Sequence, residues 1–205
     1  MISQSVLEAI RNSPDGIASL DVLESLGLCD RSTLKTTISR LNRSGRILRL
    51  KRGTYSVKPP RDALTCAQQV FNGYLGFSTA MHVHGLITET PFTVFVVTSG
   101  VSGSREFGDY EFRAVALGSK AVGFEKNGNR VVSTRAKTLF DCIYLPRYAV
   151  ERSKLIDAFR QAGMTRQEWT EFDSYVKRFA AGKGRIEKEL IEAKKEIISG
   201  KRGRS

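Results

Sequence analysis

Lysine and arginine side chains gather in one short stretch of this sequence. Residues 31–61 hold ten basic residues and no acidic one, whereas residues 1–30 hold one basic and five acidic residues. Salt screens charges beyond about 8 Å, so a polyanion responds to such a local patch more than to the net charge of +12. The stretch is therefore a candidate site for binding phosphate groups, with a solvated face or an RNA contact as the alternatives.

The first part of this stretch has the pattern of an amphipathic helix. Asp30 is placed to cap a helix that runs to about Ser44, in which Leu34, Ile38 and Leu41 share a narrow arc. The other side has no acid after the cap, and its hydroxyl and guanidinium groups suit phosphates and base edges. The DNA contacts expected on this helix are Arg31, Ser32, Thr33, Lys35, Thr36, Ser39, Arg40 and Arg43.

The second part reads as a β-hairpin. Residues 46–57 contain two short apolar strands around a basic turn with Gly53. We expect Ile47, Leu48, Leu50, Tyr55 and Val57 to cover the preceding helices. Arg49, Lys51 and Arg52 are then left at the wing as further DNA contacts.

Two shorter helices are expected before this pair of elements. Residues 5–12 open with a capping-box spacing at Ser5 and Glu8. Ser19 is placed to cap a second helix, with Leu20, Leu23 and Leu26 at helical spacing before Gly27. Three helices followed by a hairpin is the winged-helix order, so residues 1–60 are predicted to form a winged helix-turn-helix that binds double-stranded DNA. A winged helix used only for protein contacts is the alternative.

The remainder predicts a mixed domain, so the fold class is α+β. Pro59 and Pro60 mark the boundary, residues 61–200 form the second domain, and residues 201–205 are a basic, disordered tail. Helices are expected at residues 64–71 and, capped by Ser78, at 78–84. Strands are expected at residues 92–98, 110–117, 121–126 and 130–133, with a surface loop at 99–104. Several helices follow, from about residues 136, 155, 165 and 186.

Other residue patterns give weaker indications of chemistry. His82 and His84 would not share a helix face, and no third metal ligand at suitable spacing is evident, so neither a metal nor another cofactor is predicted. Asp109, Glu111 and Arg113 share one strand face by period two, which resembles a nuclease site less than a solvated face.

One carboxylate and the three cysteines lie in apolar surroundings, and for the carboxylate an active role remains as open as a structural one. Asp141 lies among apolar residues of a helix, near Arg135 and Lys137, which fits a buried, paired carboxylate. Cys29, Cys66 and Cys142 are read as small core residues. With no long apolar run and no signal peptide, we expect a cytoplasmic protein that is not an enzyme and has no membrane partner.

Three segments of the chain together resemble the AbiEi antitoxin family. They are residues 52–57 (RGTYSV), residues 78–86 (STAMHVHGL) with 91–94 (PFTV), and residues 133–141 (STRAKTLFD). The resemblance implies a transcriptional repressor that binds inverted repeats ahead of its own operon. It also implies the antitoxin of a type IV toxin-antitoxin system for phage defence by abortive infection, one that antagonises a nucleotidyltransferase-like toxin without a stable complex.

Two functions of other classes remain as alternatives. A metal-dependent nuclease would use the strand that carries Asp109 and Glu111. A protein-binding adaptor would use the C-terminal helices.

Overall fold

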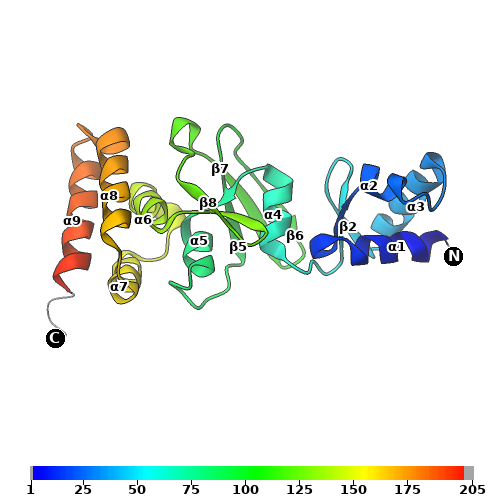
Figure 1. Cartoon of the computed structure of the whole chain (residues 1–205), viewed down its shortest axis with the longest axis horizontal. Helices are drawn as coiled ribbons and strands as arrows, with labels where there is room; N and C mark the ends of the chain where they lie inside the picture. Colours follow the sequence, from blue (N-terminus) through cyan, green and yellow to red (C-terminus); the bar gives the residue numbers. More distant parts are fainter. Residues whose placement is uncertain (1, 201–205) are drawn as a thin grey trace. The chain divides into compact units, whose positions relative to one another are not determined.

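The computed structural model describes residues 2–200, and the chain divides into two compact units, Met1–Asn72 and Gly73–Ser205 (Figure 1). Both units combine helices with a β-sheet, which confirms the α+β class. The basic tail expected at 201–205 lies outside the described residues.

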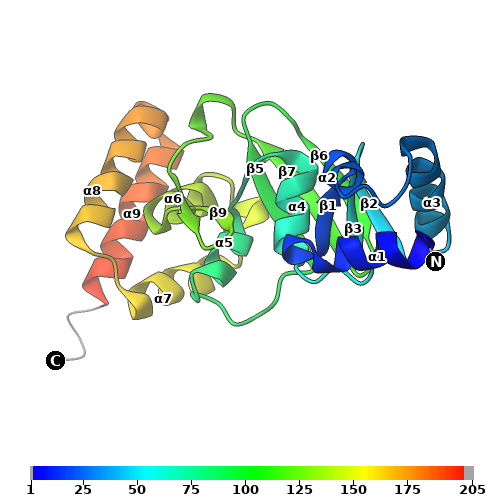
Figure 2. The same ribbon diagram turned by 45° about the vertical axis from the view of Figure 1, so that its right-hand side comes forward.

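The first unit places helices against a small antiparallel sheet, which Figure 2 shows beside α1. The strand order is β1-β3-β2. Its core consists of buried aliphatic side chains from the first three helices and the sheet, among them Leu7, Leu23, Leu34, Ile38 and Ile47. Its elements are α1 (Ile2–Asn12), β1 (Ile17–Ser19), α2 (Leu20–Ser25), α3 (Arg31–Arg43), β2 (Ile47–Lys51), β3 (Thr54–Val57) and α4 (Ala63–Phe71).

Helix α3 follows its prediction closely. The Asp30 carboxylate accepts hydrogen bonds from the backbone N–H groups of Ser32 at 2.9 Å and Thr33 at 3.0 Å. Leu34, Ile38 and Leu41 are buried, as their spacing predicts. The hairpin is also confirmed, and Gly53 takes a φ of 73° at its turn, a conformation that glycine adopts without strain.

Other details of the first unit differ from the predictions. The capping box at Ser5 is wrong, because α1 begins at Ile2 and Ser5 lies inside it. Helix α2 ends at Ser25, so Leu26 is 52 % exposed, and Cys29 is half-buried instead of in the core. Strand β1 was not expected; it exists because its three residues pair with β3.

Helix α4 belongs to the first unit, although Pro59 and Pro60 place the predicted boundary before it. The Cys66 thiol on α4 lies 3.6 Å from the buried Ser56 hydroxyl of β3. Its burial raises the pKa of Cys66 to about 11, so the group stays a thiol at neutral pH. The sequence alone does not reveal this packing because the contact depends on the folded sheet.

The second unit is built on a six-stranded mixed sheet of order β6-β7-β5-β4-β9-β8. Parallel pairing of β5 with β7 aligns Thr93 with Glu111. The sheet elements and the helix between them are β4 (Tyr74–Leu75), α5 (Phe77–Val83), β5 (Thr93–Thr98), β6 (Gly103–Phe107), β7 (Tyr110–Ala116), β8 (Phe124–Asn127) and β9 (Arg130–Ser133).

The C-terminal helices pack into the core of the second unit. They are α6 (Arg135–Tyr144), α7 (Arg152–Ala162), α8 (Arg166–Tyr175), continued by a π-helical turn over Val176–Ala180, and α9 (Arg185–Ser199). Helices α8 and α9 lie side by side in both views, and Lys194 bonds Asp173 between them at 2.7 Å (Figure 1 and Figure 2). Within residues 2–200, no helix is both long and apolar enough to span a bilayer.

Some predictions for the second unit are wrong in detail. Ser78 lies inside α5, whose N-cap is Gly76. Residues 103 and 104 start the edge strand β6 instead of belonging to a loop, because they pair with β7. Strand β8 begins at Phe124, three residues later than predicted, since a 3₁₀ turn occupies residues 118–120.

The Asp30 cap leads to a prediction of pH dependence. Hydrogen bonds from Thr33 lower the pKa of Asp30 below its ordinary value of 3.8. A carboxylate with a lowered folded-state pKa stabilises the fold above its unfolded-state pKa, and that contribution is lost as the pH falls through the folded value. We expect Asp30→Ala to lower the unfolding temperature by a few degrees at pH 7, and Asp30→Asn, which keeps a cap, by less.

The measurement is thermal unfolding of the three full-length proteins between pH 2.5 and 7. The advantage of wild type over Asp30→Asn should disappear toward the acid end. A constant difference across that range would contradict a charged cap.

Candidate nucleic-acid interface

Helix α3 exposes an outer ridge made of Ser32, Thr36, Ser39 and Arg43. At about 100° per residue, these side chains point away from Leu34 and Ile38. All four ridge residues are exposed. Arg40 and Thr33 lie on one flank of the ridge, and Arg31, Lys35 and Asn42 lie on the other.

The hairpin is held beside the second flank by two bonds. The Asn42 side chain accepts the backbone N–H of Arg49 at 3.1 Å. The backbone N–H of Leu20, at the start of α2, donates to the Gly53 carbonyl oxygen at 2.7 Å. These contacts fix the hairpin relative to α2 and α3 without using a basic side chain.

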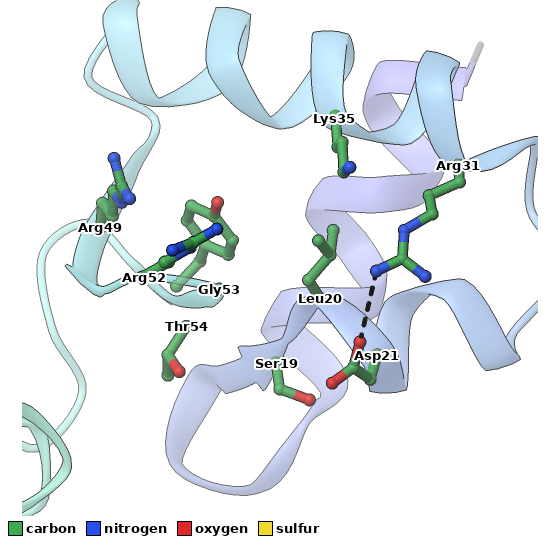
Figure 3. Close-up of a pocket in the computed structure, with 10 residues that line it drawn as sticks. Ser19, Leu20, Asp21, Arg31, Lys35, Arg49, Arg52, Gly53 and Thr54 are labelled. Atoms are coloured by element: carbon green, nitrogen blue, oxygen red, sulfur yellow. Dashed lines mark ion pairs between the residues drawn. The ribbon is translucent and has the colours of Figure 1, made fainter.

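A hollow of about 420 Å³, here called the basic hollow, lies between α2, α3 and the hairpin. Figure 3 shows Lys35 reaching toward it from α3, with Arg49 and Arg52 on one side and Arg31 and Asp21 on the other. Hydroxyl groups add hydrogen-bonding capacity to its wall. The lining residues are Ser19, Leu20, Asp21, Arg31, Lys35, Arg49, Arg52, Gly53, Thr54 and Tyr55.

Most of the basic residues predicted to bind DNA are exposed and make no side-chain hydrogen bond or ion pair with any other described residue. They are Lys35, Arg40, Arg43, Arg49 and Arg52. Because no internal acid neutralises them, their charges remain available to an external anion. This set covers both the helix and the hairpin.

Three other predicted contacts are already engaged within the unit, whereas Ser32, Thr36 and Ser39 remain exposed on the ridge. Arg31 forms an ion pair with Glu24 at 2.8 Å and lies 4.0 Å from Asp21. Lys51 is half-buried and donates to Asn72 at 2.8 Å. Thr33 donates its hydroxyl to the Asp30 cap at 2.5 Å.

Sequence reasoning missed the roles of Asn42 and Asp21. Asn42 is one polar residue among many on α3, and only the folded hairpin shows what it binds. Asp21 was counted with the acidic stretch 1–30, whereas the fold places it in the wall of the basic hollow.

The fold does not bring the residues of the nuclease alternative together into one site. Asp109 lies in the turn before β7, not on the strand as predicted. Glu111 accepts from Arg113 at 2.7 Å and from Thr93 at 3.2 Å. Among residues 2–200, no group of three or more His, Cys, Asp or Glu side chains is placed to hold a metal ion.

The two histidines contact different surroundings. The His84 ring nitrogen Nε2 lies 2.7 Å from the Ser133 carbonyl oxygen, which joins α5 to β9. The His82 ring is half-buried, and its Nδ1 atom has no hydrogen-bond partner within the described chain.

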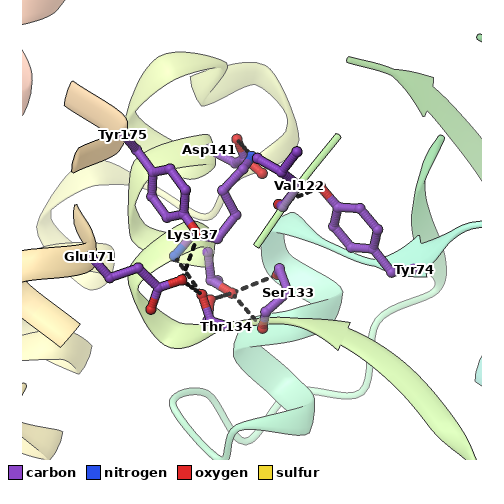
Figure 4. Close-up of polar contacts among 9 residues, drawn as sticks. Tyr74, Val122, Ser133, Thr134, Lys137, Asp141, Glu171 and Tyr175 are labelled. Atoms are coloured by element: carbon purple, nitrogen blue, oxygen red, sulfur yellow. Dashed lines mark hydrogen bonds and ion pairs between the residues drawn. The ribbon is translucent and has the colours of Figure 1, made fainter. Parts of the chain in front are cut away.

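A buried ion pair lies at the centre of the second unit. Lys137 Nζ and Asp141 Oδ1 are 2.5 Å apart on α6, with side chains 0 % and 2 % exposed, which confirms Asp141 as a buried, paired carboxylate (Figure 4). Burial lowers the pKa of Lys137 and raises the pKa of Asp141 to about 6, because the lost hydration outweighs the mutual attraction. Cys142, the next residue, is buried as predicted.

A hydrogen-bond network around the Glu171 carboxylate lies beside this pair. Thr134 donates to Glu171 at 2.8 Å, and the Tyr175 hydroxyl donates to the same carboxylate oxygen at 2.5 Å. The Tyr175 ring lies 5.8 Å from Lys137 Nζ, within range of a cation–π contact. These contacts tie α8 to α6, and they are structural.

Comparison with family models and with curated proteins finds no match to this chain.

The buried pair gives a prediction for stability. Asp141→Ala should cost about 3 to 5 kcal/mol of unfolding free energy, because it leaves the Lys137 charge buried and uncompensated. Replacing both residues, as Lys137→Met with Asp141→Leu, should recover most of that loss. The measurement is denaturant unfolding of the full-length variants.

The solvent-accessible Arg113–Glu111 pair, with side chains 44 % and 31 % exposed, supplies the control. Glu111→Ala should cost less than about 1 kcal/mol, since surface ion pairs contribute little. A loss for Asp141→Ala as small as that of the control would show that Lys137 sheds its proton or reaches water at little cost.

Proposed function

We propose that the first unit is a winged helix-turn-helix that binds double-stranded DNA sequence-specifically. The observation that carries this proposal is the set of exposed, internally uncompensated cations on α3 and the hairpin, from Lys35 to Arg52. A helix fits the DNA major groove, which is about 12 Å wide. The outer ridge of α3 then faces the base edges, while the basic hollow faces the phosphate backbone.

The arrangement of polar groups supports this division. Arg43 is accompanied on the ridge by hydroxyls, which hydrogen-bond to base edges and phosphates alike. Lys35, Arg49 and Arg52 instead surround a concave space, and a compact anion such as phosphate fits there. Contacts to phosphate set affinity and register, and contacts to bases set specificity.

We further propose a biological setting from the resemblance of the three segments to AbiEi antitoxins. The chain acts in the cytoplasm as a repressor of its own operon, through inverted repeats. It antagonises a nucleotidyltransferase-like toxin without forming a stable complex, and it works by binding instead of catalysis.

The DNA-binding proposal is tested by separating the ridge from the hollow. An operator is first selected from random duplexes. The ridge variant combines Arg43→Ala, on the ridge, with Arg40→Ala, on the flank away from the hollow. It should relax discrimination between operator and scrambled duplex by about 1 to 3 kcal/mol. Arg52→Ala should weaken binding to both duplexes alike. It should also lower the dependence of log affinity on log salt concentration, the salt slope, by about one, as expected for a lost phosphate contact.

Arg11→Ala, an exposed arginine of α1, is the matched control and should change neither quantity appreciably. If Arg52→Ala abolished discrimination while the ridge variant kept it, the hairpin would read the sequence and the docking proposed here would be wrong. Failure of wild type to prefer any duplex would reject sequence-specific binding.

The antitoxin proposal is tested by growth rescue from a co-expressed toxin of the nucleotidyltransferase class. Full-length protein should restore growth, and the ridge variant should also restore it when expressed from a constitutive promoter, because neutralisation does not need operator binding. The measurement is colony formation with and without toxin induction. Rescue that depends on Arg40 and Arg43 would place the antitoxic activity in DNA binding alone.

A further inference from the structure

The wall of the basic hollow contains a carboxylate as well as cations. Asp21 lies in the first turn of α2, and its side chain is 87 % exposed. Figure 3 shows it beside Arg31, on the side of the hollow away from Arg49 and Arg52. An exposed acid facing a proposed phosphate site needs an explanation, because it repels the ligand.

The charge of Asp21 is only partly compensated. Arg31, its nearest cation at 4.0 Å, is bound more closely by Glu24 at 2.8 Å. Two carboxylates thus share one guanidinium. The group formed by Asp21, Glu24 and Arg31 therefore carries a net negative charge at the α2 end, with Glu24 just outside the lining of the hollow. The other end and the middle carry Lys35, Arg49 and Arg52, which make no ion pair with the described residues.

We propose that Asp21 is a specificity-determining residue, whose carboxylate keeps DNA phosphates out of the α2 end of the hollow. The inference rests on the proposed DNA binding. A DNA backbone that follows the hairpin end of the hollow is attracted by three cations and stays away from the Asp21 carboxylate. A DNA backbone displaced toward α2 is repelled by that carboxylate. Specificity is a difference between affinities, so a penalty on displaced placements raises it without adding a contact to the correct site.

Asp21 also has an ordinary structural role, which the test must separate from this one. An acid in the first turn of a helix interacts favourably with the helix dipole. That role affects stability, and it changes the affinities for two different duplexes equally. A change in the ratio of the affinities is therefore the informative quantity.

The experiment compares full-length wild type with Asp21→Asn, Asp21→Glu and Glu8→Gln. Asp21→Asn removes the charge with little change in shape, and Asp21→Glu keeps the charge. Glu8→Gln is the matched control, since it raises the net charge equally from an exposed position on α1 outside the hollow. Binding to the selected operator and to random duplexes is measured from low to physiological salt, and thermal unfolding checks that each variant is folded.

We expect Asp21→Asn to strengthen binding to random duplexes about two- to fivefold at low salt, the size of one partly screened charge interaction near a surface. Operator affinity should rise less, so discrimination falls, and the salt slope for random duplexes should steepen by up to about one. Asp21→Glu should behave as wild type, and Glu8→Gln should leave the ratio unchanged.

If Asp21→Asn strengthened binding to operator and random duplexes equally, as Glu8→Gln does, the inference would be overturned and the proposed DNA binding would stand. Loss of discrimination in Asp21→Glu would also overturn it, because shape and not charge would then matter. Absence of binding by wild type would instead reject the proposed function, and this inference with it.

Discussion

The bond from the Arg49 backbone N–H to the Asn42 side chain is the contact on which the basic face depends. Together with the bond from Leu20 to the Gly53 carbonyl, it fixes the hairpin to the helices through uncharged groups. If an acid held the hairpin in place, it would neutralise one of the cations that face outward. The first unit therefore keeps its shape and its charge by separate means, and the ligand meets cations that are already positioned.

The second unit encloses a pair of charged side chains, Lys137 and Asp141, in its core. Its central charges are taken out of water, and the cost is offset in part by a direct ion pair and by contact with aromatic rings. Such a pair is sensitive to the loss of either partner, and the Tyr175 ring of α8 lies within cation–π range of Lys137 on α6. The two units thus use charge in opposite ways, exposed on one and enclosed in the other.

What the sequence predicts well is local. The Asp30 cap, the apolar spacing of α3 and the glycine of the hairpin turn each act within a few residues, and all three are found as expected. The i, i+4 spacing of Lys137 and Asp141 likewise anticipates their pairing.

The sequence predicts poorly those elements and contacts that depend on partners far away along the chain. Strands β1 and β4 have three and two residues, too few to show a pattern, and they form only because other strands pair with them. The edge strand β6 begins with glycine and serine and resembles a loop. The sequence predicts Arg31 and Lys51 as DNA contacts because their internal partners, Glu24 and Asn72, are recognisable only in the fold.

The pairing of β1 with β3 has a further consequence for how the first unit folds and opens. Ile17 aligns with Ser56, so this ladder closes a chain segment that contains α2, α3 and β2. The entropy of closing a loop grows with its length, and the hairpin, which is local, carries a smaller cost. We therefore expect the β1 ladder to form after the hairpin. Opening it leaves the local pairing of β2 with β3 intact, so we expect the amide hydrogens of β1 to exchange with solvent faster than those of the hairpin.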